Sequence, residues 1–130
     1  PARLASSPSA EGGMCPVDSI NRQAASGAAS ASKRNPFGIE GWAVTALRDR
    51  PTPPLVFAVL RGQGGEYFLE GKRKPRPDVA KGDPLLQNAG FEVAGYLANV
   101  PAGKFSLHVA MGDERMIVLC NTGVAIHVTD

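Results

Sequence analysis

Hydrophobic and polar positions alternate most regularly in the segment KFSLHVAM, residues 104–111. Its apolar residues fall on one face of an extended chain, and the lysine, serine and histidine fall on the other. The same two-residue period recurs in FEVAGYL (91–97) and VAIHV (124–128). Alternation of this kind is typical of strands that cover a hydrophobic core with one face only.

Other apolar segments lie between turn-forming residues. LVFAVLR (55–61) is a continuous apolar run, which predicts a central strand covered on both faces. GQGG then predicts a hairpin turn, with EYFLEG (66–71) as the returning strand. FGIEGWAVTAL (37–47) is β-prone, and MIVLC (116–120) precedes an NTG turn.

These segments amount to about seven short strands from Phe37 onward, and no segment has a convincing helical pattern. We therefore expect an all-β fold, an antiparallel two-sheet sandwich of immunoglobulin-like topology, over residues 37–130. A small barrel is the alternative.

Residues 1–36 differ from the rest because they are small, polar and without periodicity. We expect them to be disordered or loosely attached, with one short strand near Cys15 in CPVDSIN. The stretch RQAASGAASASKRNP (22–36) is almost a low-complexity Ala/Ser/Gly linker, and we interpret it as a mobile loop. The chain begins PARLASS, so we expect a mature fragment or an excised domain.

The composition restricts the class of protein. The chain has 130 residues, of which 43% are hydrophobic and 20% charged, as in one globular domain. Its formal net charge is only +2, which argues against a nucleic-acid partner. The longest apolar runs are far shorter than the roughly 20 residues that a membrane-spanning helix needs, so we expect no membrane span in this chain.

The two cysteines, Cys15 and Cys120, are far apart in the sequence. We expect a disulfide between them that ties the N-terminal segment to the C-terminal sheet. Closing a loop of about 100 residues would contribute on the order of 4 to 5 kcal/mol in the chain-entropy model. The disulfide predicts a secreted or periplasmic location, whereas two buried free thiols in a cytosolic protein are the alternative.

A basic stretch, GKRKPRPDVAKGD (71–83), contains five cationic side chains and two prolines. Pro77 and Asp78 favour a tight turn, which Arg76 and Asp78 can bracket. No aromatic residue or recognition helix accompanies the cations, as nucleic-acid modules would require. We interpret the stretch as a structural crossover between the sheets, and a patch for an anionic partner is the alternative.

The candidates for ligand binding are aromatic. Trp42 is flanked by small residues, which is typical of a sandwich core, but with Tyr67 and Tyr96 it would form a carbohydrate-binding face if exposed. His108 and His127 fall on the polar faces of two strands, and we expect surface histidines. We find no catalytic constellation, and neither a metal site nor a cofactor is predicted, because no CxxC or other ligand spacing occurs.

The succession GWAV, VFAVL, RPDVA, GF and VPAGKFSLHV resembles β-sandwich modules that accompany bacterial cell-envelope proteins. Some of these modules are appended to membrane glycosyltransferases and other surface-polysaccharide proteins. The resemblance covers roughly residues 37–130 and implies that Trp42, Arg76, Asp78 and Phe91 are framework positions. It also implies an extracytoplasmic accessory domain beside a membrane-embedded parent or another protein partner.

From the sequence we therefore expect a noncatalytic accessory or interaction module of the bacterial cell envelope. A carbohydrate-binding module that contacts a cell-surface glycan is the alternative function.

Overall fold

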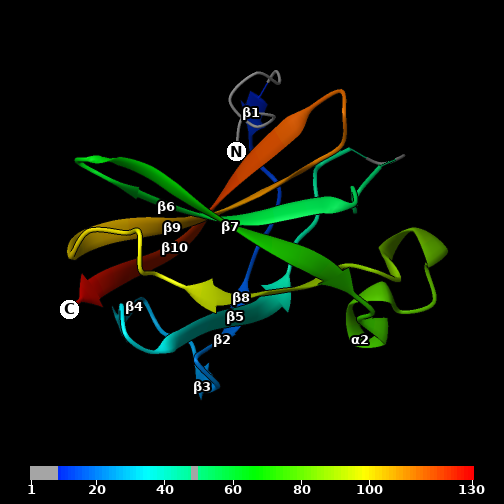
Figure 1. The fold of residues 1–130 in the computed structure, drawn as a ribbon. Helices are drawn as coiled ribbons and strands as arrows, with labels where there is room; N and C mark the ends of the chain where they lie inside the picture. Colours follow the sequence, from blue (N-terminus) through cyan, green and yellow to red (C-terminus); the bar gives the residue numbers. More distant parts are fainter. Residues whose placement is uncertain (1–8, 48–49) are drawn as a thin grey trace.

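The computed structural model describes residues 9–47 and 50–130, and it confirms an all-β fold (Figure 1). The apolar alternation of the sequence is realised as strands, because each buries its apolar side and pairs its backbone with neighbours. The strands are β1 (Ser9–Glu11), β2 (Val17–Ile20), β3 (Gln23–Ala24), β4 (Ala28–Ser32), β5 (Pro36–Trp42), β6 (Leu55–Gly62), β7 (Gly65–Lys74), β8 (Gly90–Tyr96), β9 (Gly103–Gly112) and β10 (Ile117–Thr129). Two short helices, α2 (Pro77–Ala80) and η1 (Pro84–Leu86), separate β7 from β8.

All ten strands belong to one sheet with the order β1-β10-β9-β6-β7-β8-β5-β2-β3, and β4 pairs with β10. The sheet curls into a half-barrel because β7 serves both halves of it. Residues up to Glu70 of β7 pair with β6, and residues from Gly71 onward pair with β8. A Cβ at Gly71 would lie 2.5 Å from Val93 Cγ2 and 2.8 Å from the Glu92 carbonyl oxygen, so only glycine permits this close approach.

The expected two-sheet sandwich of seven strands is therefore not what forms, and the curled sheet is closer to the small-barrel alternative. One reason is that β10 is a single strand where two were expected. The NTG segment is a β-bulge rather than a hairpin turn, with a register shift between Asn121 and Val124. Gly123 (φ +78°) donates its N–H to Asn121 Oδ1 at 2.8 Å, so the chain continues in the same direction.

The expectation for residues 22–36 was wrong, because this stretch contains β3 and β4. β4 pairs in parallel with the last part of β10, and Ala31 on it is buried. Small side chains allow β4 to lie against the core without large apolar residues, so the usual sequence signal for a strand is missing. Residues 9–36 thus share one sheet with the rest of the protein, and the expectation for residues 1–8 lies outside the described residues.

The concave face of the curled sheet encloses the main core. The inward residues of each alternating segment are buried there, among them Phe37, Ile39, Leu60, Phe91 and Leu107. β6 also buries Val59 on its outer face, in a small second cluster with Ala110 and Ile117. The predicted central strand with two covered faces is therefore confirmed for β6, which lies between β7 and β9.

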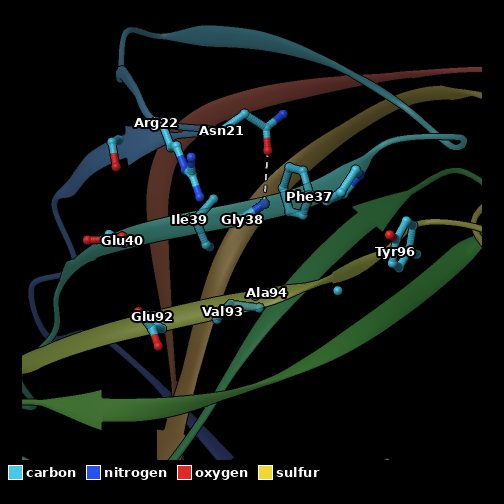
Figure 2. A pocket seen from close by; sticks show the side chains of 13 residues that line it. Asn21, Arg22, Phe37, Gly38, Ile39, Glu40, Glu92, Val93, Ala94 and Tyr96 are labelled. Carbon is cyan, nitrogen blue, oxygen red and sulfur yellow. Dashed lines mark hydrogen bonds between the residues drawn. The ribbon is translucent and has the colours of Figure 1, made fainter.

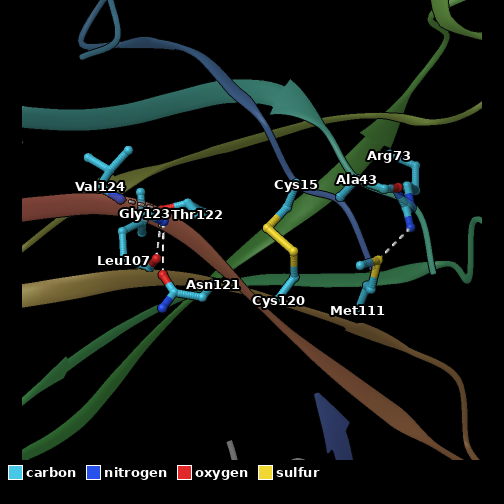
Figure 3. The surroundings of a disulfide bond; sticks show 10 residues. All are labelled: Cys15, Ala43, Arg73, Leu107, Met111, Cys120, Asn121, Thr122, Gly123 and Val124. Atoms are coloured by element: carbon cyan, nitrogen blue, oxygen red, sulfur yellow. Dashed lines mark hydrogen bonds between the residues drawn. A yellow bond between two sulfur atoms is a disulfide. The ribbon is translucent and has the colours of Figure 1, made fainter. Parts of the chain in front are cut away.

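The predicted disulfide between Cys15 and Cys120 is present and buried (Figure 3). It joins the segment that precedes β2 to the first half of β10, across 105 positions of sequence. The Cα atoms are 6.2 Å apart, a usual separation for a disulfide. The bond therefore links the two halves of the curled sheet.

Candidate functional site

A groove of about 790 Å³ lies on the outer face of β2, β5 and β8 (Figure 2). Gly38 and Ala94 are cross-strand partners at its centre, and their small side chains leave the sheet uncovered there. Phe37, Ile39 and Val93 also line it, but their side chains are buried in the core, so they contribute backbone. The groove is therefore a strip of bare sheet between larger polar side chains.

An exposed aromatic side chain closes one end of this groove, and two carboxylates close the other (Figure 2). Tyr96 is 61% exposed and pairs with Pro36, whereas Glu40 and Glu92 are cross-strand partners four positions along the ladder. Four residues of extended chain span about 13 Å. The groove therefore offers an aromatic ring and hydrogen-bonding groups within the length of a short oligomer.

The two carboxylates belong to a band of ion pairs with β7. Lys72 Nζ lies 3.1 Å and Lys74 Nζ 3.2 Å from Glu92, and Lys74 Nζ lies 3.7 Å from Glu40. Hydrogen bonds from Lys72 and then Lys74 lower the pKa of Glu92, and the bond to Glu92 raises the pKa of Lys74. At neutral pH this end of the groove therefore carries fixed charges that largely balance each other.

The turn between β2 and β3 forms the side of the groove. Asn21 and Arg22 both have positive φ angles, 51° and 69°. Asn21 donates its N–H to the Gly38 carbonyl at 2.8 Å, and its Oδ1 accepts the Gly38 N–H at 2.9 Å. These two bonds fix the turn to β5, and Figure 2 shows the Arg22 side chain extending from the turn toward β5.

The three aromatic candidates are not brought together. Only Tyr96 lines the groove. Trp42 is half-buried and pairs with Gly90 at the opposite end of the β5–β8 ladder. Tyr67 is partly buried against the core, edge-on to Phe105, with ring centroids 5.9 Å apart. A single carbohydrate face made of all three residues is therefore excluded by their positions.

Arg76 and Asp78 lie at the start of α2 and bind each other, where the sequence predicted a tight turn. Arg76 binds Asp78 through two hydrogen bonds of 2.8 Å each, and its Nη1 lies 2.6 Å from Asp18 Oδ2. Chiefly because of the bonds from Arg76, the pKa of Asp78 falls to about 2. However, the segment joins β7 to β8, which are neighbours in the sheet, so the crossover interpretation was wrong.

Sequence reasoning missed the role of Arg73, which points into the protein from β7 (Figure 3). Its guanidinium donates to the carbonyl oxygens of Ala43 at 2.6 Å, Pro53 at 2.9 Å and Ala89 at 3.2 Å. Burial lowers the pKa of Arg73 to about 10. The signal was the strand alternation itself: if β7 continues through the basic stretch, Gly71 and Arg73 fall on its inner face.

The two histidines do not form a site. His127 is exposed, as expected, and lies opposite Lys104. His108 is only 7% exposed, so the expectation of a surface histidine was wrong there, and its Nε2 lies 3.0 Å from the Ser106 hydroxyl. Burial lowers the pKa of His108. Within residues 9–47 and 50–130 no group of His, Cys, Asp or Glu side chains is arranged to hold a metal ion.

Neither a protein-family model nor a curated protein matches this chain. None of the helices in the described part of the chain is long and apolar enough to cross a membrane.

Proposed function

We propose that this chain is a noncatalytic, extracytoplasmic accessory module of the bacterial cell envelope that binds a saccharide in the groove of β2, β5 and β8. The observation that carries the proposal is the groove itself, with Tyr96 exposed at one end and carboxylates at the other. Ligand sites combine a bare apolar surface with a few polar groups that fix orientation. This groove has that composition.

Saccharides suit this arrangement better than apolar ligands do. A pyranose ring has a C–H face that packs on an aromatic ring, and hydroxyl groups around its rim that need hydrogen-bond partners. Tyr96 offers a ring with a polar tip, and Asn21, Glu40 and Glu92 offer amide and carboxylate groups. The small side chains at Gly38 and Ala94 would let a sugar ring lie close to the backbone.

The charge state of the carboxylates supports a noncatalytic role. Glu40 and Glu92 are cross-strand partners, so their Cβ atoms are about 5 Å apart. A pair of carboxyl groups at such a distance can hydrolyse a glycosidic bond only if one of them is held protonated. Glu92 is kept ionised by Lys72 and Lys74, and Lys74 also pairs with Glu40. Both carboxylates are therefore held in ion pairs with lysines, which suits a binding role.

The disulfide supports the proposed compartment. A buried bond between Cys15 and Cys120 is compatible with an oxidising location, which supports a secreted or periplasmic module. The cell-envelope assignment rests on the sequence resemblance to modules beside membrane glycosyltransferases. A protein partner or a membrane-embedded parent would hold the module near the glycan.

The test is an NMR titration of the ¹⁵N-labelled protein with three trisaccharide-sized probes, one neutral, one carrying carboxylates and one carrying phosphate. We expect at least one probe to shift the amide signals of Asn21, Gly38, Ala94 and Gly95, and we expect Tyr96→Ala to weaken that binding about tenfold or more. Trp42→Phe is the matched control, because Trp42 lies outside the groove. Shifts confined to other surfaces, or equal binding by Tyr96→Ala, would reject the proposal.

A further inference from the structure

Arg22 occupies a backbone conformation that suits glycine better than arginine. It is the second residue of a two-residue turn in which both φ angles are positive, 51° at Asn21 and 69° at Arg22. Hairpin turns with this geometry strongly favour Asn-Gly, because glycine has no Cβ to clash in the left-handed region. The first position has the favoured asparagine, whereas the second has a large side chain that reduces stability there.

Two hydrogen bonds hold the turn that carries Arg22 beside the groove. Asn21 is bound to both the N–H and the carbonyl of Gly38, at 2.9 and 2.8 Å, so the turn is fixed beside the groove floor. Arg22 follows directly and lines the groove with its side chain exposed (Figure 2). The strained residue therefore presents its guanidinium where a ligand would lie.

Arg22 also differs from the other charged residues of the groove. Glu92 is paired with Lys72 and Lys74, and Glu40 is paired with Lys74. In the part of the chain that the structure describes, no carboxylate lies within ion-pair distance of Arg22. Lys72 and Lys74 do not line the groove, but they pair with its two glutamates from β7. Arg22 is therefore the charged lining residue that has no ion-pair partner among the described residues.

We propose that Arg22 recognises an anionic group, so that the ligand of the groove is an acidic saccharide that bears carboxylate or phosphate. This inference rests on the proposed function. A guanidinium has a planar fork of donors that matches the oxygens of either group, and such charge-assisted pairs are about twice as strong as neutral hydrogen bonds. The strain at Arg22 is then explained by ligand recognition rather than by folding.

The test compares wild type, Arg22→Gly and Arg22→Lys in calorimetric titrations with trigalacturonate, neutral galactotriose and a phosphomannose. We expect wild type to bind at least one acidic probe about tenfold or more tightly than the neutral one, with affinity falling as salt is added. Arg22→Gly should lose that preference while its midpoint of thermal unfolding rises, because glycine relieves the strain. Arg22→Lys should keep part of the preference. The two acidic probes distinguish carboxylate from phosphate.

Arg34→Ala is the matched control, because Arg34 is exposed but does not line the groove. It should bind every probe as wild type does. If acidic and neutral probes bind equally, or if Arg22→Gly keeps the acidic preference, the inference about Arg22 is wrong while saccharide binding in the groove stands. If no probe shifts the groove amides in the NMR titration, the proposed function fails as well.

Discussion

The outer face of the β5–β8 ladder is covered by a side chain at one end and open at the other. Each end has one aromatic residue: Trp42 lies opposite Gly90 at one end, and Tyr96 lies opposite Pro36 at the other, two positions from Ala94. At the Trp42 end, the Arg76 side chain fills the space over Gly90, only 2.5 Å from where a Cβ would lie. At the Tyr96 end, the space over Gly38 and Ala94 is open.

The arginines of the two ends differ in the same way. Arg76 is held by the carboxylates of Asp18 and Asp78, so its charge is used within the fold. Arg22 pairs with no carboxylate in the described ranges and lies in the open groove. A cation whose partners come from the chain itself stabilises structure, whereas a cation without them, held in an unfavourable backbone conformation, points to a ligand.

The largest effect should come from removing the disulfide that links the two halves of the sheet. Replacing both cysteines, Cys15→Ser with Cys120→Ser, should lower the free energy of unfolding by about 4 kcal/mol, because the unfolded chain gains the freedom of a long open loop. Urea unfolding followed by circular dichroism measures the loss. A loss below about 1 kcal/mol would show that the disulfide does not hold the halves of the sheet together.

A matched pair of glycine substitutions separates the two ends. Gly90→Ala should lower stability by about 2 kcal/mol, because the new Cβ would meet Arg76 Cγ at 2.5 Å and the Lys74 carbonyl oxygen at 2.8 Å. Gly38→Ala should change stability by less than about 0.5 kcal/mol, since the nearest contact is an ordinary 3.5 Å to the Val93 carbonyl oxygen.

For the affinity of the saccharide, the larger effect should come from Gly38→Ala rather than from Gly90→Ala. Gly38→Ala places a methyl group on the floor of the groove and should weaken saccharide binding, whereas Gly90→Ala should leave it unchanged at temperatures where the variant is folded. Calorimetric titration with the probe that wild type binds measures both. Equal losses of stability in the two variants would contradict the contrast between a filled and an open end.

A smaller effect should appear at acid pH at the filled end. The pKa of Asp78 is lowered from 3.8 to about 2, chiefly by hydrogen bonds from Arg76. The stabilisation that this pair gives is therefore present above the unfolded value and is lost as the pH falls from 3.8 toward 2. Asp78→Asn should show a flatter decline of stability in that window. Parallel declines in both proteins, measured by urea unfolding at several pH values, would contradict the assignment.

Sequence patterns were sufficient for features that depend on a residue and its near neighbours. The strands at 55–61, 91–97 and 104–111 follow from apolar runs and alternation, and each corresponds to a strand, β6, β8 or β9. Pro77 and Asp78 carry turn chemistry, and α2 begins at Pro77. The disulfide followed from the even count of cysteines in a β-rich chain.

Features that depend on which strands meet were not visible in the sequence. The curl of the sheet depends on close approach at Gly71, and the pairing of β4 with β10 depends on alanines and serines that have no hydrophobic period. The groove was missed for a similar reason, because its floor consists of small side chains, at Gly38 and Ala94, that leave space. Patterns of large apolar residues predict a core from sequence alone. A groove over small residues can be recognised only when the residues beside them in the fold are known.

The most direct test of ligand binding at Tyr96 is a measurement of intermolecular nuclear Overhauser effects between the protein and the saccharide probe that binds it best. We expect contacts between the C–H protons of the sugar and the ring protons of Tyr96, with none to the ring of Trp42. Contacts to Trp42 without contacts to Tyr96 would place the ligand at the other end of the β5–β8 ladder and contradict binding in the groove.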